Sequence, residues 1–171
     1  MDFNLADSSA TDALGAALAR TLAGAAPAPG VPGGGVLYLQ GDLGAGKTTC
    51  ARSLLRALGV VGLVRSPTYT LVETYEPAGL TCIHVDLYRL QSLTEVDELG
   101  LRDLVGPGCL LLVEWPDRGG GALPAADLTV ALNYAGEGRQ ARVTAHSPWG
   151  SRWLENLGSD TSLRGYLSNL T

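Results

Sequence analysis

Lysine is almost missing from this chain of 171 residues: eleven of its twelve basic side chains are arginines, and Lys47 is the single lysine. Acidic side chains outnumber basic ones, and the formal net charge is −5 at pH 7. Proteins that bind nucleic acid unaided draw most of their affinity from Lys and Arg on phosphates. The charge balance therefore argues against autonomous nucleic-acid binding, and any role with RNA should run through a partner.

Cysteine is also scarce, with three residues that stand far apart and form no Cys-x-x-Cys pair. An odd, scattered set of this kind suits a reducing compartment better than a disulfide framework. The long uncharged stretch 22–41 is broken by Pro and Gly before it could span a bilayer. Asp2 and Asp7 stand where a secretory signal would carry basic residues. We expect a cytoplasmic protein that does not enter a membrane.

Charged residues make up 17% of the chain and hydrophobic residues 46%, a balance typical of folded proteins and not of disordered ones. The length fits a single domain over residues 1–171. We expect a Gly/Pro-rich connection at 24–35 and a peripheral C-terminal segment at 147–171, beginning with a helix near Trp149.

Hydrophobic periodicity predicts an alternation of helices and strands. An amphipathic helix is expected over 7–22, and an apolar strand over 36–39 leads through a glycine loop into a helix over 47–58. The remaining elements are expected to be strands at 69–75 and 81–86, a short helix at 94–100, an apolar central strand at 109–113, and a hairpin of 127–134 and 139–146. The pattern favours an α/β fold.

The loop Gly41-Asp42-Leu43-Gly44-Ala45-Gly46-Lys47-Thr48 matches the phosphate-binding P-loop motif in its expected setting between strand and helix. Its backbone N–H groups, from Leu43 through Gly44, Ala45 and Gly46, would surround a β-phosphate at the positive end of the helix. Lys47 would bridge the β- and γ-phosphates, the Thr48 hydroxyl would coordinate Mg²⁺, and Thr49 would donate to the α-phosphate.

Magnesium also requires a carboxylate at the same edge of the sheet, and two candidates follow apolar runs: Asp86 and Glu114. The shorter Asp86 suits a direct or water-mediated metal contact. The longer Glu114 suits the ion or the attacking water. For either residue the alternative is a solvated strand end.

Three further residues have a possible place at this edge. Thr68, after Pro67, is a candidate sensor of the γ-phosphate, with a plain turn as the alternative. Trp115 follows Glu114 and is a candidate wall of the site. His84 shares strand parity with Asp86, but here a hydrogen-bonded core histidine is the favoured interpretation.

The nucleotide is expected to be ATP, because the guanine-reading motif Asn/Thr-Lys-x-Asp would need a second lysine. Two rival functions are kept. The first is a small-molecule P-loop kinase, in which Arg118 of the glycine-rich stretch would imitate a lid arginine. The second is a binding module that uses ATP only to set its shape.

Five ordered motifs resemble the TsaE family, bacterial P-loop ATPases needed to form threonylcarbamoyladenosine (t6A) at position 37 of tRNA. The resemblance extends over about residues 7–145. The motifs are the P-loop with Thr49, Ser66-Pro67-Thr68-Tyr69-Thr70-Leu71-Val72-Glu73, His84-Val85-Asp86-Leu87-Tyr88-Arg89-Leu90, Glu98-Leu99-Gly100-Leu101-Arg102-Asp103, and Glu114-Trp115-Pro116.

The resemblance implies a P-loop sheet with a parallel centre, antiparallel flanking strands and helices on both faces. It also implies an ATPase that works with the partner proteins TsaD and TsaB and meets tRNA only through them. Carried over by motif, the phosphate ligand is Lys47, the metal ligands are Thr48, Glu114 and Asp86, and the catalytic face includes Thr68 and Trp115. Weaker transfers place Thr11 and Arg139 against the nucleotide.

Overall fold

The computed structural model of the protein describes residues 1–24, 34–77 and 79–168. Most of the predicted Gly/Pro-rich connection at 24–35 lies outside these residues. The strands are β1 (Asp2–Leu5), β2 (Gly35–Gly41), β3 (Val72–Tyr75), β4 (Thr81–Asp86), β5 (Cys109–Glu114), β6 (Leu128–Ala135) and β7 (Gly138–Ala145). The α-helices are α1 (Ser8–Gly24), α2 (Lys47–Ala57), α3 (Leu93–Glu98) and α4 (Pro148–Ser159), and short 3₁₀ turns are η1 (Pro116–Arg118), η2 (Gly120–Ala122) and η3 (Thr161–Leu163).

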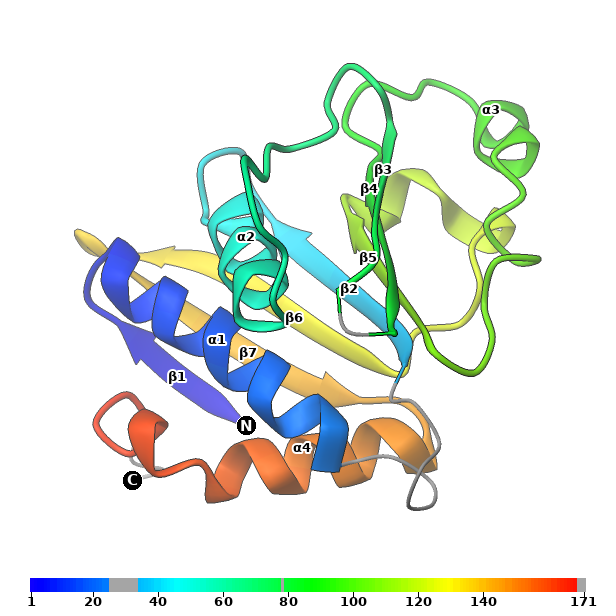
Figure 1. Cartoon of the computed structure of the whole chain (residues 1–171). Helices are drawn as coiled ribbons and strands as arrows, with labels where there is room; N and C mark the ends of the chain where they lie inside the picture. The colour runs from blue at the N-terminus through cyan, green and yellow to red at the C-terminus, as the bar shows by residue number, and fades with distance from the viewer. Residues whose placement is uncertain (25–33, 78, 169–171) are drawn as a thin grey trace.

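The strands form one sheet in the order β1-β7-β6-β2-β5-β4-β3. Strands β6, β2, β5 and β4 are parallel to one another, whereas β1, β7 and β3 join antiparallel at the flanks. The predicted parallel centre with antiparallel flanks is therefore confirmed. Parallel pairing brings the carboxyl ends of β2, β4 and β5 to one edge, where the P-loop begins (Figure 1).

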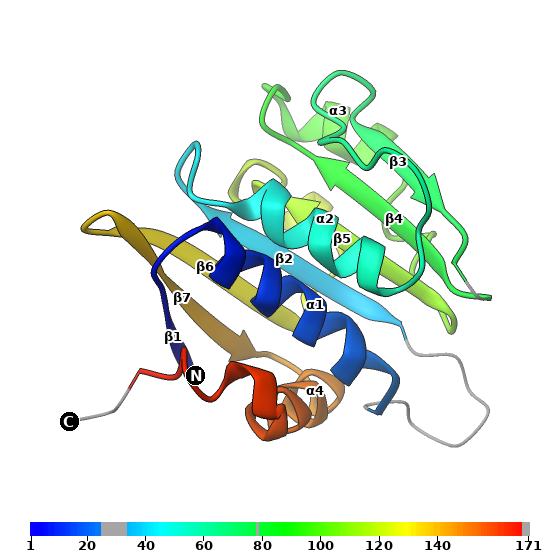
Figure 2. The same cartoon turned by 60° about the vertical axis from the view of Figure 1, so that its left-hand side comes forward.

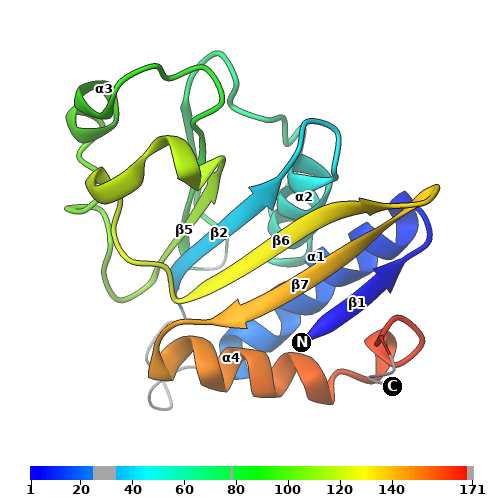
Figure 3. The same cartoon turned by 180° about the vertical axis from the view of Figure 1, so that it is seen from behind.

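Helices cover the two faces of the sheet unequally. One face packs under α1, α2 and α4 in a core that includes Leu37, Leu112 and Trp153. The other face is covered over β2, β4 and β5 by α3 and the chain around η1 and η2, with Val96 and Leu111 in that core. Figure 3 shows this second side, where β6 and β7 carry no helix.

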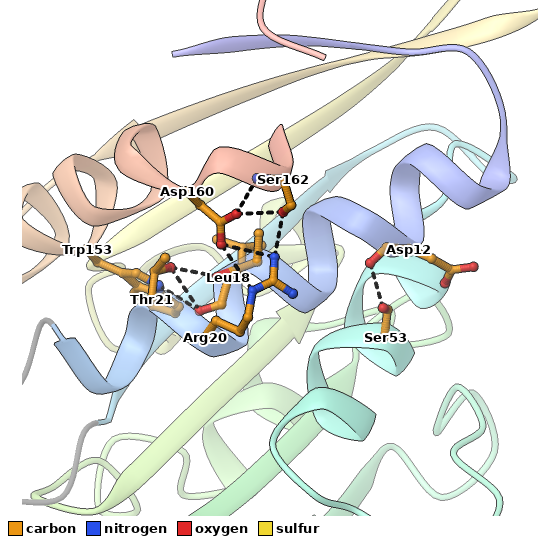
Figure 4. Close-up of polar contacts among 9 residues, drawn as sticks. Asp12, Leu18, Arg20, Thr21, Ser53, Trp153, Asp160 and Ser162 are labelled. Carbon is orange, nitrogen blue, oxygen red and sulfur yellow. Dashed lines mark hydrogen bonds and ion pairs between the residues drawn. The ribbon is translucent and has the colours of Figure 1, made fainter. Parts of the chain in front are cut away.

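Figure 2 shows α1, α2 and α4 on the first face of the sheet. Side-chain to backbone hydrogen bonds join these three helices (Figure 4). The Trp153 indole Nε1 donates to the Leu18 carbonyl at 3.0 Å, and the Ser53 hydroxyl donates to the Asp12 carbonyl at 2.6 Å. Trp153 is fully buried. The part of the expected C-terminal segment that forms α4 thus contributes directly to the core.

Besides α4, which lies in the core although segment 147–171 was expected to be peripheral, two details differ from the sequence-based expectation. Strand β1 was not predicted, because its alternation of buried Phe3 and Leu5 with polar neighbours is too short to stand out. The strand expected to begin at residue 69 begins at Val72 instead. Leu71 has a left-handed backbone (φ 64°) and its N–H donates to the Pro67 carbonyl, so 68–71 is a turn.

Close packing of α1 on α2 depends on Gly15. A Cβ built there would overlap the Cys50 carbonyl oxygen and lie 2.9 Å from Ser53 Cβ. We expect Gly15→Ala to lower the free energy of unfolding by about 1–3 kcal/mol, despite alanine's better helix propensity, because overpacking has a cost of that size. Urea denaturation measures the change.

Gly158→Ala in α4 is the matched control. The added Cβ meets only the flexible Met1 side chain, at 2.6 Å from its Cε, so this variant should unfold at nearly the wild-type urea concentration. Wild-type stability of Gly15→Ala would contradict the close approach of the two helices.

Candidate functional site

The P-loop joins the end of β2 to the start of α2. Gly46 is the N-cap of α2, with a left-handed backbone (φ 112°) and no side chain to accept from the helix amides. The first N–H groups of an α-helix have no partner inside the helix. A Cβ at Gly41 would overlap the Leu132 carbonyl oxygen. The loop therefore needs its glycines, and it presents the first N–H groups of α2 at the positive end of a helix dipole, an arrangement suited to an anion.

Lys47 lies folded over this loop and is 4% exposed. Its Nζ donates to the carbonyls of Gly41 and Asp42, each at 2.8 Å, and lies 3.8 Å from the centroid of the Trp115 ring. Burial lowers the Lys47 pKa, while Glu114, Asp86 and Asp42 act to raise it. The cation is thus removed from water and bound by neutral carbonyls, which an anionic phosphate would replace favourably.

Glu114 links the P-loop helix to the sheet. It ends β5, is 1% exposed, and its Oε2 accepts a hydrogen bond from the Thr48 hydroxyl at 2.8 Å. Its other oxygen, Oε1, lies 2.8 Å from His84 Nε2. Asp86 ends β4 opposite Glu114 in the parallel register and is 4% exposed. The two predicted carboxylates and Thr48 therefore meet at one edge.

Asp86 also fixes the segment that contains Thr68. Its Oδ2 accepts from the hydroxyls of Ser66 and Thr68, the latter at 3.1 Å, and its Oδ1 accepts from the Tyr88 N–H at 2.9 Å. The two hydroxyls lie 2.8 Å apart. The predicted sensor Thr68 is thus beside the predicted metal ligand, and Ser66 is a contact that the sequence did not indicate.

Trp115 has a backbone that a tryptophan rarely adopts, with φ 59° and ψ 48°. Its ring lies over Lys47 and also 4.9 Å from the ring centroid of Tyr88. Non-glycine residues in this conformation gather at functional sites, because the surrounding structure must hold them there. The prediction that Trp115 stands at the wall of the site agrees with this geometry.

Thr11 and Arg139, which the family resemblance assigned to the nucleotide site with the weakest motif support, border one cavity of about 380 Å³ beside the P-loop. Thr11 is 2% exposed, and Arg139 lies 3.4 Å from the Gly44 carbonyl through Nη2. Among the residues that line this cavity are also Asp7, Gly44, Ala45, Gly46, Thr49 and Glu137.

Leu43, at the tip of the P-loop, is 67% exposed and lies outside the set that lines this cavity. Its carbonyl accepts from the Tyr134 hydroxyl at 2.9 Å, and the Arg139 guanidinium stacks 4.5 Å from the Tyr134 ring centroid. A Cβ at Gly44 would lie 2.7 Å from that hydroxyl. Tyr134, which sequence reasoning missed, therefore supports the loop from the β6–β7 hairpin.

Magnesium is compatible with the donors at this edge. In the described part of the chain no cluster of three or more His, Cys, Asp or Glu is arranged to hold a metal ion by itself. Mg²⁺, however, usually binds one or two carboxylates together with water and substrate phosphates. A threonine hydroxyl, a glutamate and an aspartate beside the amides of the P-loop fit that requirement.

Comparison with known proteins places this geometry in a family. The family model "Threonylcarbamoyl adenosine biosynthesis protein TsaE" matches residues 5–143. The chain belongs to the TsaE family. The TsaE of Haemophilus influenzae is 44% identical over 115 residues, which is 67% of this chain and 73% of that protein. The TsaE of Bacillus subtilis is 35% identical over 136 residues, 80% of this chain and 83% of that protein.

A solved structure shows the same fold. The crystal structure of Bacillus subtilis YdiB matches with a TM-score of 0.71 and 28% identity, over 93% of this chain and 94% of that one. The predicted TsaE resemblance and P-loop fold class are confirmed. Within residues 1–24, 34–77 and 79–168, no helix has the length and hydropathy needed to cross a membrane.

The hydrogen bonds from Ser66 and Thr68 to Asp86 predict that this carboxylate holds segment 64–71 against the end of β4. Hydrogen bonds to a charged group contribute about 1.5–3 kcal/mol each. We expect Asp86→Ala to speed tryptic cleavage after Arg65 by about tenfold or more, since roughly 1.4 kcal/mol corresponds to a factor of ten. Limited proteolysis well below the melting temperature, followed by mass spectrometry, gives the rate.

Asp97→Ala, which removes an exposed carboxylate from α3, is the control and should leave cleavage after Arg65 unchanged. An Asp86→Ala protein that is cut no faster than wild type would show that the segment is held by other contacts.

Proposed function

We propose that this TsaE-family protein binds and hydrolyses ATP with Mg²⁺ and so supports t6A formation at position 37 of tRNA, together with TsaD and TsaB in the cytoplasm. The observation that carries the proposal is the meeting of Lys47, Thr48, Asp86 and Glu114 at the mouth of an uncapped P-loop. The net charge of −5 supports the part of the proposal in which tRNA is met through the partner complex.

The polyphosphate would be held by the loop amides from Leu43 to Thr49, with Lys47 moving from its two carbonyl partners to the β- and γ-oxygens. The cavity bounded by Thr11 and Arg139 lies directly beside Gly44 and Thr49. It therefore offers room for the rest of the nucleotide, and Arg139, which lines it, stacks on the Tyr134 ring.

Magnesium would be held by Thr48 and Glu114, with Asp86 supporting it directly or through water. When bound, the ion would neutralise charge that develops on the transferring phosphoryl group. Glu114 has a second role, to orient the attacking water. Thr68, hydrogen-bonded to Asp86 at 3.1 Å, is placed to follow the γ-phosphate. In this proposal turnover is slow in the protein alone and is accelerated by the partners.

A small-molecule kinase remains the alternative function, and one contact weighs against it. Arg118, the candidate lid arginine, lies with its guanidinium 5.4 Å from the Tyr88 ring centroid and donates to the Leu90 carbonyl at 3.4 Å. It is packed onto the chain after β4, and the P-loop helix is followed by the β3–β4 hairpin, which offers no helical acceptor domain.

The decisive experiment supplies γ-³²P-labelled ATP to the purified protein with and without TsaD, TsaB and tRNA. Release of free phosphate that rises with the partners, together with t6A formation, supports the proposal. Label that appears on a metabolite supports the kinase.

Lys47→Ala removes the single lysine and its charge from the phosphate site. We expect hydrolysis to fall to background and affinity for ATP to drop by at least about tenfold, because charge-assisted bonds to phosphate of about 1.5–3 kcal/mol are lost. Isothermal calorimetry and phosphate release measure the two effects. Arg20→Ala, a cation on α1 paired with Asp160 at 3.0 Å, is the control and should change neither. Normal hydrolysis in the Lys47 variant would refute the assigned site.

Glu114→Gln keeps the side-chain shape but removes its negative charge. At saturating Mg²⁺ we expect ATP binding within a few-fold of wild type and hydrolysis about 100-fold slower, since loss of a positioned base has effects of that order. If t6A formation survives while hydrolysis is lost, ATP acts by setting the protein's shape. If both persist, Glu114 has no part in the chemistry.

A further inference from the structure

His84 is fully buried in β4, and its Nε2 lies 2.8 Å from Oε1 of Glu114. It stands two residues before Asp86 and shares that residue's face of the sheet, while the register sets Asp86 opposite Glu114. The imidazole therefore contacts Oε1 of Glu114, whereas Thr48 contacts the other oxygen, Oε2. Sequence reasoning favoured a core histidine, and the structure shows a core histidine whose hydrogen bond is made to the site.

The second ring nitrogen limits which tautomer fits. His84 Nδ1 is buried and has no hydrogen-bond partner among the described residues. A proton on Nδ1 would leave a buried N–H unsatisfied, and in the neutral ring it would also turn the bare Nε2 toward a carboxylate. The neutral ring with the proton on Nε2 avoids both problems. In that form His84 donates to Glu114 and leaves only a weak acceptor unpaired.

We propose that His84 is a positioning residue for Glu114. Its Nε2–H holds Oε1, so that Oε2 stays beside the Thr48 hydroxyl, 2.8 Å away, at the place where magnesium would bind. Nearly all of Glu114 is buried, and without this donor the carboxylate would keep only Thr48 as a partner in the site. The inference deepens the proposed function, and it rests on that function for the role of Glu114.

The expected effect of losing His84 follows from other metal sites. There, removing a residue that hydrogen-bonds a metal ligand commonly weakens metal affinity or activity by about 10- to 100-fold. A histidine that only filled the core would change stability and leave the magnesium dependence alone. The magnesium dependence of nucleotide binding therefore separates the two roles, and it does not require turnover.

Two substitutions isolate the hydrogen bond. His84→Leu keeps apolar bulk and removes the donor, whereas His84→Gln restores an N–H near the position of Nε2. We expect the Leu variant to need about 10- to 100-fold more Mg²⁺ for half-maximal binding of a methylanthraniloyl ATP analogue, with affinity in EDTA unchanged. The Gln variant should regain most of the wild-type magnesium dependence.

His146 is the matched control, since the sequence holds two histidines. Its Nε2 lies 2.9 Å from the Thr129 hydroxyl, at the start of β6 and hence at the opposite edge of the sheet. His146→Leu should leave the magnesium dependence at the wild-type value.

Nitrogen-15 NMR of the histidine-labelled free protein gives a readout that is independent of nucleotide. The His84 signals, assigned by their absence from the Gln variant, should show a protonated Nε2 and a bare Nδ1. An Nε2 without a proton would overturn the inference. A wild-type magnesium requirement in a folded Leu variant would also overturn it. If the Leu variant does not fold, His84→Met, which also lacks a donor, takes its place: a magnesium requirement raised tenfold or more supports the role, and a wild-type requirement refutes it.

Failure of the proposed function looks different from failure of this inference. Wild-type protein that binds no ATP analogue at any magnesium concentration would end the ATP function. Wild-type protein that binds it with magnesium, beside a Leu variant that behaves identically, would end only the role of His84.

Discussion

The two hydrogen bonds to the Glu114 carboxylate, one from Thr48 and one shared with His84, connect the P-loop helix to the centre of the sheet. Glu114 is 1% exposed, and a buried carboxylate is costly unless it is paired. Thr48 and His84 must therefore stay beside it at this edge of the sheet. They bring together α2, β4 and β5, three elements that are far apart in the sequence. Every proposed role at this edge depends on that junction.

The charged groups of the site are bound by neutral groups of the protein. Lys47 binds the carbonyls of its own loop, and Asp86 accepts from Ser66 and Thr68. Each contact occupies a group that phosphate or magnesium would use. Ligand binding would therefore exchange internal hydrogen bonds for stronger ionic ones and would release the segment 64–71 from Asp86. Under the proposed function, this exchange would couple nucleotide binding to the position of segment 64–71.

The support around the P-loop comes from opposite ends of the chain. Thr11 in α1 and Arg139 in β7 border the cavity on the outside of the loop, and Tyr134 holds the Leu43 carbonyl. The α1–α2 contact at Gly15 and the Trp153–Leu18 bond keep α1 in place against the rest of the core. These residues are far apart in the sequence, so much of the chain contributes to the position of the P-loop.

Local sequence patterns determined much of the fold and of the candidate site. The glycine spacing before Lys47 predicted the P-loop, the apolar runs that end in Asp86 and Glu114 predicted the edge where carboxylates gather, and the alternating pattern near the C-terminus predicted a hairpin. The parallel centre was implied by the resemblance to the TsaE family. These signals are local because glycine torsions, strand parity and helix starts depend on neighbouring residues.

Only the tertiary structure decided the partners of those residues. That Ser66 contacts Asp86, that Tyr134 supports Leu43, and that the buried His84 faces Glu114 are outcomes of strand order and register, which no stretch of sequence encodes alone. Strand β1 also depends on tertiary structure, since its four residues form a strand only because β7 pairs with them. A hydrogen bond between distant residues needs both ends placed, and placement comes from packing the whole core.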